Sequence, residues 1–174
     1  MVRFANTSLI AKLQNSRLSA VLPKRAPANV ESCVSSFTYV STEVDGLRNV
    51  IQNGGVLDTG SAYYDLQSTI DKAQASCCSI NTVIADVDSD YVNGVLNTIT
   101  PKMQSALTLV ASKKDDYNIF TRVLVGNRVK ELEKSTTRLN TCLTNFTPDS
   151  KKPALQTYID AMKLAFSSTL TAYD

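Results

Sequence analysis

Apolar residues recur every three or four positions along most of this 174-residue chain, which is the spacing that places side chains on one face of an α-helix. Four helices are predicted over residues of about 29–52, 59–85, 88–114 and 117–146. A fifth opens either at Thr147-Pro148-Asp149 or at Pro153 after one loose turn. No alternating strand pattern of useful length competes. We therefore expect an all-α fold, an antiparallel up-down bundle of about five long helices with short connections.

Local signals mark where these helices begin, end and bend. Asn53-Gly54-Gly55 is typical of a helix end, and Asp88-Ser89-Asp90 offers capping oxygens near the start of the third helix. The second apolar pattern continues to Ile84, so its helix is expected to reach Ala85. Pro101 lies inside the third pattern, where we expect one helix kinked at the proline rather than two helices.

Composition removes several classes of chemistry. The chain contains no His, which excludes Ser-His-Asp and Cys-His catalysis and any His-based metal site. Its six glycines form no phosphate-binding loop motif. The hydrophobic content of 43% is enough for a sizeable core. We therefore expect a protein without enzymatic activity and without a cofactor.

Charge is distributed unevenly along the chain. The first thirty residues carry five basic residues and no acid, whereas the remainder carries 13 basic and 16 acidic residues, a net charge of −3. An acidic body is a poor match to a polyanion, so nucleic acid is not an expected partner. No run of 18 apolar residues occurs, so no segment is expected to span a membrane.

Residues 1–28 are expected to form a basic N-terminal tail or a targeting or pro-segment, ahead of a helical domain over 29–174. The stretch from Phe4 to Ala11 resembles a short secretory apolar region interrupted by polar residues. Lys24-Arg25 suits a dibasic processing protease. An acid-free, basic segment also fits a mitochondrial presequence or a tail without an address, and the sequence leaves these alternatives open.

The four cysteines are Cys33, Cys77, Cys78 and Cys142. In an up-down bundle, the start of the first helix and the ends of the second and fourth lie at the same end. Two disulfides are therefore expected, with the adjacent pair divided between Cys33 and Cys142, which would indicate an oxidising compartment. The alternative is that three of them are small core residues. A metal site is not expected, because without His it would need all four thiolates.

Acidic clusters lie where helices begin. Asp86, Asp88 and Asp90 are near the start of the third helix, and Asp115-Asp116 precede the fourth. Carboxylates at these places cap the helix or complement its dipole, so we expect that role rather than a cation site.

Two glycosylation sequons occur in the chain. They are Asn6-Thr7-Ser8 and Asn145-Phe146-Thr147. Asn145 lies at a predicted helix end, where a glycan could be accommodated, and it is the glycosylation candidate.

With catalytic and metal chemistry not expected, the feature left to explain a function is the apolar surface of helices that can move. Their polar faces are rich in Ser, Thr, Asn and Asp, which are mediocre helix formers. Burial of the apolar stripe along each helix, which we call its seam, must therefore supply most of the stability. Such a bundle can hold an apolar chain in its core, or open and lay its seams on an oily surface. An ordinary packed core has the same pattern.

One segment carries a family resemblance. From Ile99 to Lys114 the chain has an apolar residue, Thr-Pro, an apolar-Gln-x-Ala-Leu stretch and a Lys-Lys pair, and Ala165-Phe166 and Ala172-Tyr173 follow near the C-terminus. This pattern resembles the fungal hydrophobic surface-binding protein A family, which is related to the fungal cell-wall galactomannoprotein antigens. The resemblance implies a secreted or wall-associated helical protein without enzymatic activity. Members adsorb to hydrophobic surfaces, and some related domains hold fatty acids in a helical bundle.

We therefore expect a non-enzymatic protein, secreted or in the cell wall, that binds fatty acids, other lipids or hydrophobic surfaces. The alternatives are an adhesive wall protein without a ligand, and a mitochondrial or cytoplasmic helical interaction protein. Seam positions, rather than the family, provide the candidate ligand-binding residues. These are Phe37, Val40, Val44, Leu66, Ile70, Met103, Leu107, Leu139, Met162 and Phe166.

Overall fold

The structure of the protein, a computed structural model, describes residues 26–53 and 56–174. In that part of the chain all regular structure is helical. The elements are α1 (Ala28–Asn53), α2 (Val56–Cys78), α3 (Asp86–Ser112), the short 3₁₀-helix η1 (Lys114–Asp116), α4 (Ile119–Phe146) and α5 (Lys152–Tyr173). The predicted all-α class with five long helices is confirmed. The expected tail over residues 1–28 and the Asn6 sequon fall almost wholly outside the described residues, so the boundary at residue 28 stays a prediction.

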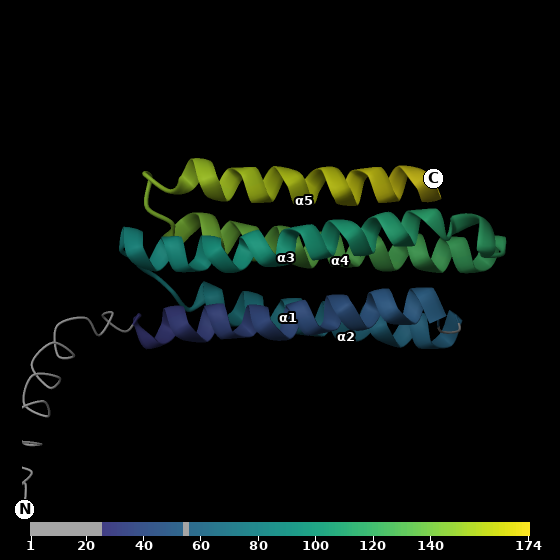
Figure 1. The fold of residues 1–174 in the computed structure, drawn as a ribbon, viewed down its shortest axis with the longest axis horizontal. Helices are drawn as coiled ribbons and strands as arrows, with labels where there is room; N and C mark the ends of the chain where they lie inside the picture. Colours follow the sequence, from purple (N-terminus) through teal and green to yellow (C-terminus); the bar gives the residue numbers. More distant parts are fainter. Residues whose placement is uncertain (1–25, 54–55) are drawn as a thin grey trace, which may run out of the picture.

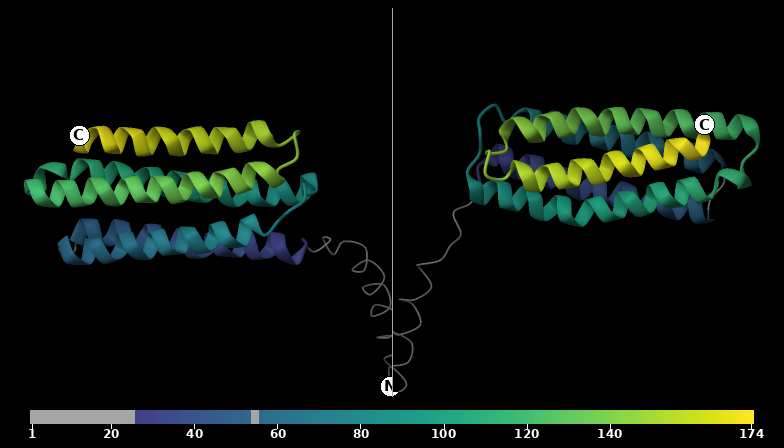
Figure 2. Two further views of the ribbon diagram at one scale, coloured as in Figure 1. Left: turned by 180° about the vertical axis from the view of Figure 1, so that it is seen from behind. Right: turned by 90° about the horizontal axis from the view of Figure 1, so that it is seen from above.

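The five long helices form a closed ring. Consecutive helices run in opposite directions, as predicted (Figure 1). α1 packs against α2 and α3, α2 packs against α4, α4 against α5, and α5 against α3. When viewed from above, α5 lies between α3 and α4 (Figure 2). Because α2/α3 and α3/α4 are not packing neighbours, the helices in these consecutive pairs face each other across the interior of the ring.

The predicted seams line this interior, which explains why the helices form where they do. Phe37, Val40 and Val44 of α1 are all buried, with exposures of 2, 3 and 0%. The side chain of Asn118 accepts a hydrogen bond from the Thr121 backbone N–H, so α4 begins with a conventional N-cap. α5 begins at Lys152, which confirms the second of the two predicted starts.

The predicted end of the second helix is wrong. α2 ends at Cys78, and the chain then continues without helix as far as Ala85. Ile80 and Ile84 are nevertheless buried, so their four-residue spacing reflects a linker that covers the core. The Ser79 hydroxyl donates to the backbone carbonyl three residues earlier, at 2.6 Å, and this local bond competes with another helical turn.

The start of the third helix also differs from expectation. Its N-cap is Ala85, with no side-chain capping bond, so the predicted capping oxygens do not cap. Asp86 and Asp88 lie in the first turn, where they complement the helix dipole. Asp90 instead forms an ion pair with Lys151 at 2.7 Å, which raises the pKa of that lysine through the hydrogen bond. α3 is one helix through Pro101, as predicted, and the kink there stays a prediction.

Two disulfides close one end of the ring. They join Cys33 to Cys77 and Cys78 to Cys142, so all four cysteines are paired. This confirms the prediction that the adjacent cysteines Cys77 and Cys78 bond to different partners. The disulfides link α1, α2 and α4 at the end where the up-down topology brings these helices together. α3 and α5 carry no cysteine and are held only by packing and polar contacts.

Candidate functional site

An apolar cavity of about 40 Å³ lies inside the ring, and all five long helices contribute to its walls. Its lining residues are Phe37, Val40, Ile70, Leu96, Ile99, Thr100, Met103, Thr136, Leu139, Asn140, Leu143, Leu155, Tyr158, Ile159 and Met162. The walls are almost entirely hydrocarbon, which suits a ligand that is itself apolar over most of its length.

Six of the ten predicted ligand-binding residues line this cavity. They are Phe37, Val40, Ile70, Met103, Leu139 and Met162. The other four are buried but lie outside the lining: Val44, Leu66, Leu107 and Phe166. Each of these four lies one helical turn from a lining residue, toward the end of the bundle without disulfides. The cavity is therefore centred about one turn nearer the disulfides than the sequence predicted.

The sequence reasoning missed the polar residues of the cavity, Thr100, Thr136, Asn140 and Tyr158. A signal for Thr136 was present, because it continues the 4-3-4 spacing that begins at Leu132 and continues through Leu139. The ten expected ligand-binding residues are all apolar, so they include no threonine.

Thr136 carries an unpartnered polar atom. Its hydroxyl oxygen is buried and has no hydrogen-bond partner in the described part of the chain. Other threonines of α4, such as Thr141 and Thr144, donate to the backbone carbonyl four residues earlier. A buried hydroxyl left without a partner costs roughly 1–3 kcal/mol. A ligand oxygen placed in the cavity would remove that cost.

The cavity is too small for a long ligand in the state described here. About 10–15 Å³ of such space accommodates one water molecule, so 40 Å³ holds only about three groups of that size. A long-chain ligand would fit only if helices of the ring moved apart. α5 is the simplest candidate for this motion, because it has no disulfide. Thr169 and Tyr173 attach its C-terminal half by donating to the Leu107 and Val110 carbonyls, at 3.1 and 2.7 Å.

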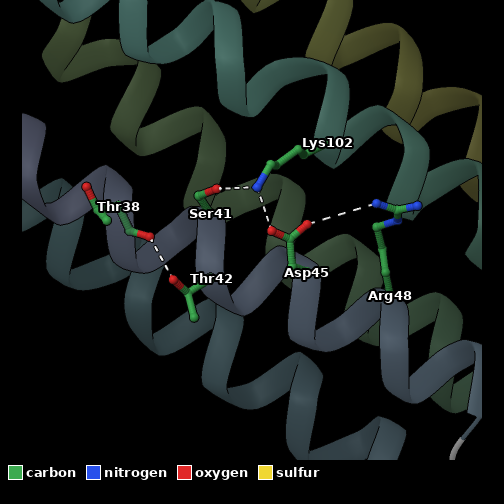
Figure 3. A network of polar contacts seen from close by, with 6 residues as sticks. All are labelled: Thr38, Ser41, Thr42, Asp45, Arg48 and Lys102. Carbon is green, nitrogen blue, oxygen red and sulfur yellow. Dashed lines mark hydrogen bonds and ion pairs between the residues drawn. The ribbon is translucent and has the colours of Figure 1, made fainter.

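Polar contacts join α1 to α3 beside the cavity (Figure 3). Lys102 lies next to the lining residue Met103, and its ammonium donates to Ser41 at 2.9 Å and to Asp45. Arg48 lies 3.9 Å from the other oxygen of Asp45. All of these charged groups are partly exposed, and exposed pairs of this kind contribute about 0–1 kcal/mol. The α1–α3 seam is therefore held chiefly by its apolar contacts.

A second apolar feature lies on the outside of α4. Ile119, Phe120, Val123 and Leu124 are 72, 80, 61 and 63% exposed, and we call them the α4 patch. Their i, i+1, i+4, i+5 spacing places them on one side of the first two turns. A group of large exposed apolar side chains is typical of a surface that contacts another apolar body.

Metal clusters and membrane-spanning helices were assessed within the described residues. Within them, no three or more acidic or cysteine side chains are grouped so that they could hold a metal ion. None of the helices that the structure describes is long and apolar enough to cross a bilayer.

Comparison with known proteins places the chain in a family and a fold. The model of the family described as hydrophobic surface binding protein A matches residues 30–145. The fold is similar to that of AFMP4P, whose structure was solved in complex with palmitic acid. That similarity has a TM-score of 0.76 at 20% identity, and it covers 83% of this chain and 99% of the other.

Two domains of the Penicillium marneffei MP1 protein have the same fold. Its ligand-binding domain 2, in complex with arachidonic acids, has a TM-score of 0.77 at 12% identity, covering 88% of this chain and 97% of that domain. Its ligand-binding domain 1, also complexed with arachidonic acids, has a TM-score of 0.76 at 10% identity, covering 84% and 99%. No curated protein sequence matches the chain.

Proposed function

The chain belongs to the hydrophobic surface binding protein A family, and on this premise we propose that it is a non-enzymatic binding protein for long-chain fatty acids. The observation that carries the proposal is the apolar cavity whose lining includes Thr136, a residue with a buried, unpartnered hydroxyl. Unpartnered buried polar atoms are few in native proteins, and a fatty acid needs both apolar walls and a polar contact.

The related folds support the proposal because structures with this helical arrangement were solved in complex with fatty acids. AFMP4P and the two MP1 domains hold palmitic or arachidonic acids, and they share the helical arrangement of this chain. If α5 moves away from α3 and α4, the cavity would extend toward Val44, Leu66, Leu107 and Phe166. The ten residues selected from the seams would then line one continuous channel.

We place the ligand carboxyl group near Thr136 and Asn140. Asn140 is only partly buried, so this side of the cavity approaches solvent, and its side-chain amide can donate alongside the Thr136 hydroxyl. A carboxylate buried without such donors would be costly. The alkyl chain would lie against Phe37, Met103 and Leu139.

An extracellular location follows from the same proposal. Two disulfides persist in secreted and cell-surface proteins and are rare in reducing compartments. They weigh against the alternative of an intracellular interaction protein, for which free thiols would be expected. Secretion or attachment to a cell wall, and a glycan on Asn145, remain parts of the proposal.

Native mass spectrometry of the full chain incubated with palmitate tests the central claim. We expect a mass increase of one or two fatty acids that is lost on collisional activation. Phe37→Arg should abolish it, because Phe37 lines the cavity and a buried guanidinium would need hydration. Tyr39→Arg is the matched control, since Tyr39 is on the same helix but exposed.

Circular dichroism would establish that both variants are folded. If Phe37→Arg does not fold, Val40→Phe, which fills the cavity without adding charge, replaces it. Palmitate binding that is equal in a folded cavity variant and in Tyr39→Arg would refute the central site. An unmodified wild-type mass at saturating palmitate would favour the ligand-free adhesive protein.

The α4 patch favours a second function, adsorption to hydrophobic surfaces. Its four side chains can contact an oily surface without any change in the ring. This function needs no cavity, so it can coexist with fatty-acid binding or replace it.

A further inference from the structure

A second cavity, of about 180 Å³, lies at the end of the bundle opposite the disulfides. It is formed where the first turns of α2 approach the first turns of α4. Its described lining residues are Thr59, Gly60, Tyr63, Tyr117, Thr121, Leu124, Val125 and Arg128. It shares no lining residue with the central cavity. Arg128 precedes Thr136 by eight residues on α4, which is about 12 Å along the helix axis.

Hydrogen-bond donors in the lining of this second cavity include the side chains of Tyr63, Tyr117 and Arg128. Within the described residues, the guanidinium of Arg128, which is an exposed residue, forms no ion pair or hydrogen bond, and the Tyr63 and Tyr117 hydroxyls form no hydrogen bond. Burial raises the pKa of both tyrosines, so their hydroxyls keep their protons at neutral pH. The Thr121 hydroxyl differs, because it already donates to Asn118 at 3.2 Å.

The described side chains of the lining carry a net positive charge. Its described walls contain one cation, Arg128, and no acidic side chain. The outer side of Arg128 faces a shallow, solvent-open hollow that includes Asp71, Lys72 and Glu131. Glu131 and Asp71 form no ion pair with Arg128 in the part of the chain described, so the guanidinium is available to a ligand at the mouth of the cavity.

The apolar part of the lining sets the remaining chemistry. Leu124, Val125 and the ring of Tyr63 form hydrocarbon walls, and Gly60 leaves space where a side chain would otherwise lie. By the measure of 10–15 Å³ for one water-sized group, 180 Å³ holds roughly a dozen such groups. A carboxylate on a chain of about ten carbons has that size.

We propose that this cavity is a second ligand site, which binds a medium-chain fatty acid with its carboxylate on Arg128 and its alkyl chain between α2 and α4. Guanidinium and carboxylate form paired, charge-assisted hydrogen bonds, which makes Arg128 the group that selects an acid over an alcohol. The tyrosine hydroxyls supply further donors. The site uses no residue of the central cavity, so it does not depend on the palmitate site proposed above; Leu124 also belongs to the α4 patch.

Filling the space beside Gly60 tests the site directly. A Cβ at Gly60 meets no atom within 4 Å, so Gly60→Leu is accommodated in the helix and takes up the cavity. Gly46→Leu is the matched control, because Gly46 on α1 is equally open and lies outside this cavity. Titration of the full-length protein with decanoate by calorimetry should show at least tenfold weaker binding for Gly60→Leu and unchanged binding for Gly46→Leu.

Arg128→Gln tests the charge. We expect decanoate binding to weaken about tenfold or more and decanol binding to change little, because only the acid uses the guanidinium. Lys134→Gln, an exposed cation elsewhere on α4, should leave both unchanged. Equal loss of decanoate with Arg128→Gln and Lys134→Gln would indicate a general charge effect and overturn the site.

Two further outcomes would also overturn the proposal. One is the absence of decanoate binding to the wild type. The other is decanoate binding that survives Gly60→Leu but disappears in Phe37→Arg, which would assign it to the central cavity. Palmitate binding measured on the same variants separates the two sites, because Gly60→Leu should leave it intact.

Discussion

At the scale of single residues, one hydroxyl distinguishes the interior of this protein from an ordinary helical core. Thr147 and Thr169 are buried, and both donate to a backbone carbonyl four residues earlier, at 2.7 and 2.9 Å. Thr136 is buried to a similar degree, yet its hydroxyl has no partner among the described residues. The same residue type therefore stabilises the fold at two positions and is available for binding at the third.

Thr136→Val should separate stability from binding. Removing the unpartnered hydroxyl while keeping its shape should raise the free energy of unfolding by about 1 kcal/mol and weaken palmitate binding several-fold. Urea unfolding with and without palmitate measures both effects. Thr147→Val is the control, and it should lower stability by about 1 kcal/mol because its hydroxyl is bonded. A Thr136→Val protein that is less stable than wild type, or binds palmitate equally well, would contradict this role.

At the scale of elements, α4 combines several features along its length. Its first two turns carry the exposed α4 patch, its middle carries Arg128 and Thr136, and its last turns carry Cys142 in a disulfide. The helix is thus anchored at its C-terminal end, while its N-terminal end presents apolar side chains to the outside. A helix that is anchored at one end and exposes apolar side chains at the other is suited to contact with a hydrophobic surface.

Phe120→Ser should reduce adsorption to an alkylated surface without affecting the fold. Burial of one large apolar side chain contributes roughly 1.5–3 kcal/mol, so the partition coefficient should fall about tenfold or more. Its stability should stay within about 0.5 kcal/mol of wild type, because the side chain is exposed. A quartz-crystal microbalance measures adsorption, and Leu164→Ser, at an isolated exposed position on α5, is the control. Equal losses in the two variants would exclude the α4 patch as the contact surface.

At the scale of the whole molecule, disulfides close the ring at one end, whereas packing and polar contacts close it at the other. The disulfides span 44 and 64 residues and bind α1, α2 and α4 together. The opposite end, which holds the second cavity, has no such brace among the described residues. Because α3 and α5 carry no cysteine, a displacement of these two helices would leave the disulfide-linked α1, α2 and α4 in place.

Removing the Cys78–Cys142 disulfide should lower stability without changing the fold of the ligand site. In the chain-entropy model each loop of this length contributes about 4 kcal/mol, and measured losses are commonly 2–5 kcal/mol. The variant Cys78→Ala/Cys142→Ala, unfolded in guanidinium, should show such a decrease relative to wild type. Mass mapping under non-reducing conditions checks that Cys33–Cys77 is retained. An unchanged unfolding midpoint would show that the fold does not depend on this brace.

The number of helices, their alternating directions and the end of the bundle at which the cysteines pair could all be predicted from the residues alone. They depend on a periodicity that is local, and each apolar side chain reports which face of its own helix is buried. The same signal misjudged the end of α2, because Ile80 and Ile84 are buried in a linker as well as they would be in a helix. The spacing of apolar residues predicts which side chains are buried, but it does not always predict whether the backbone there is helical.

Which turn of each seam borders open space was decided only when the helices came together. Val40 and Val44 are equivalent in the sequence, yet only Val40 lines the central cavity, because the gap depends on how side chains from five helices interlock across the ring. The unpartnered Thr136 hydroxyl and the donors around Arg128 arise in the same way. The chain's periodicity determined that a helical core would form, and tertiary packing determined where that core leaves room for a ligand.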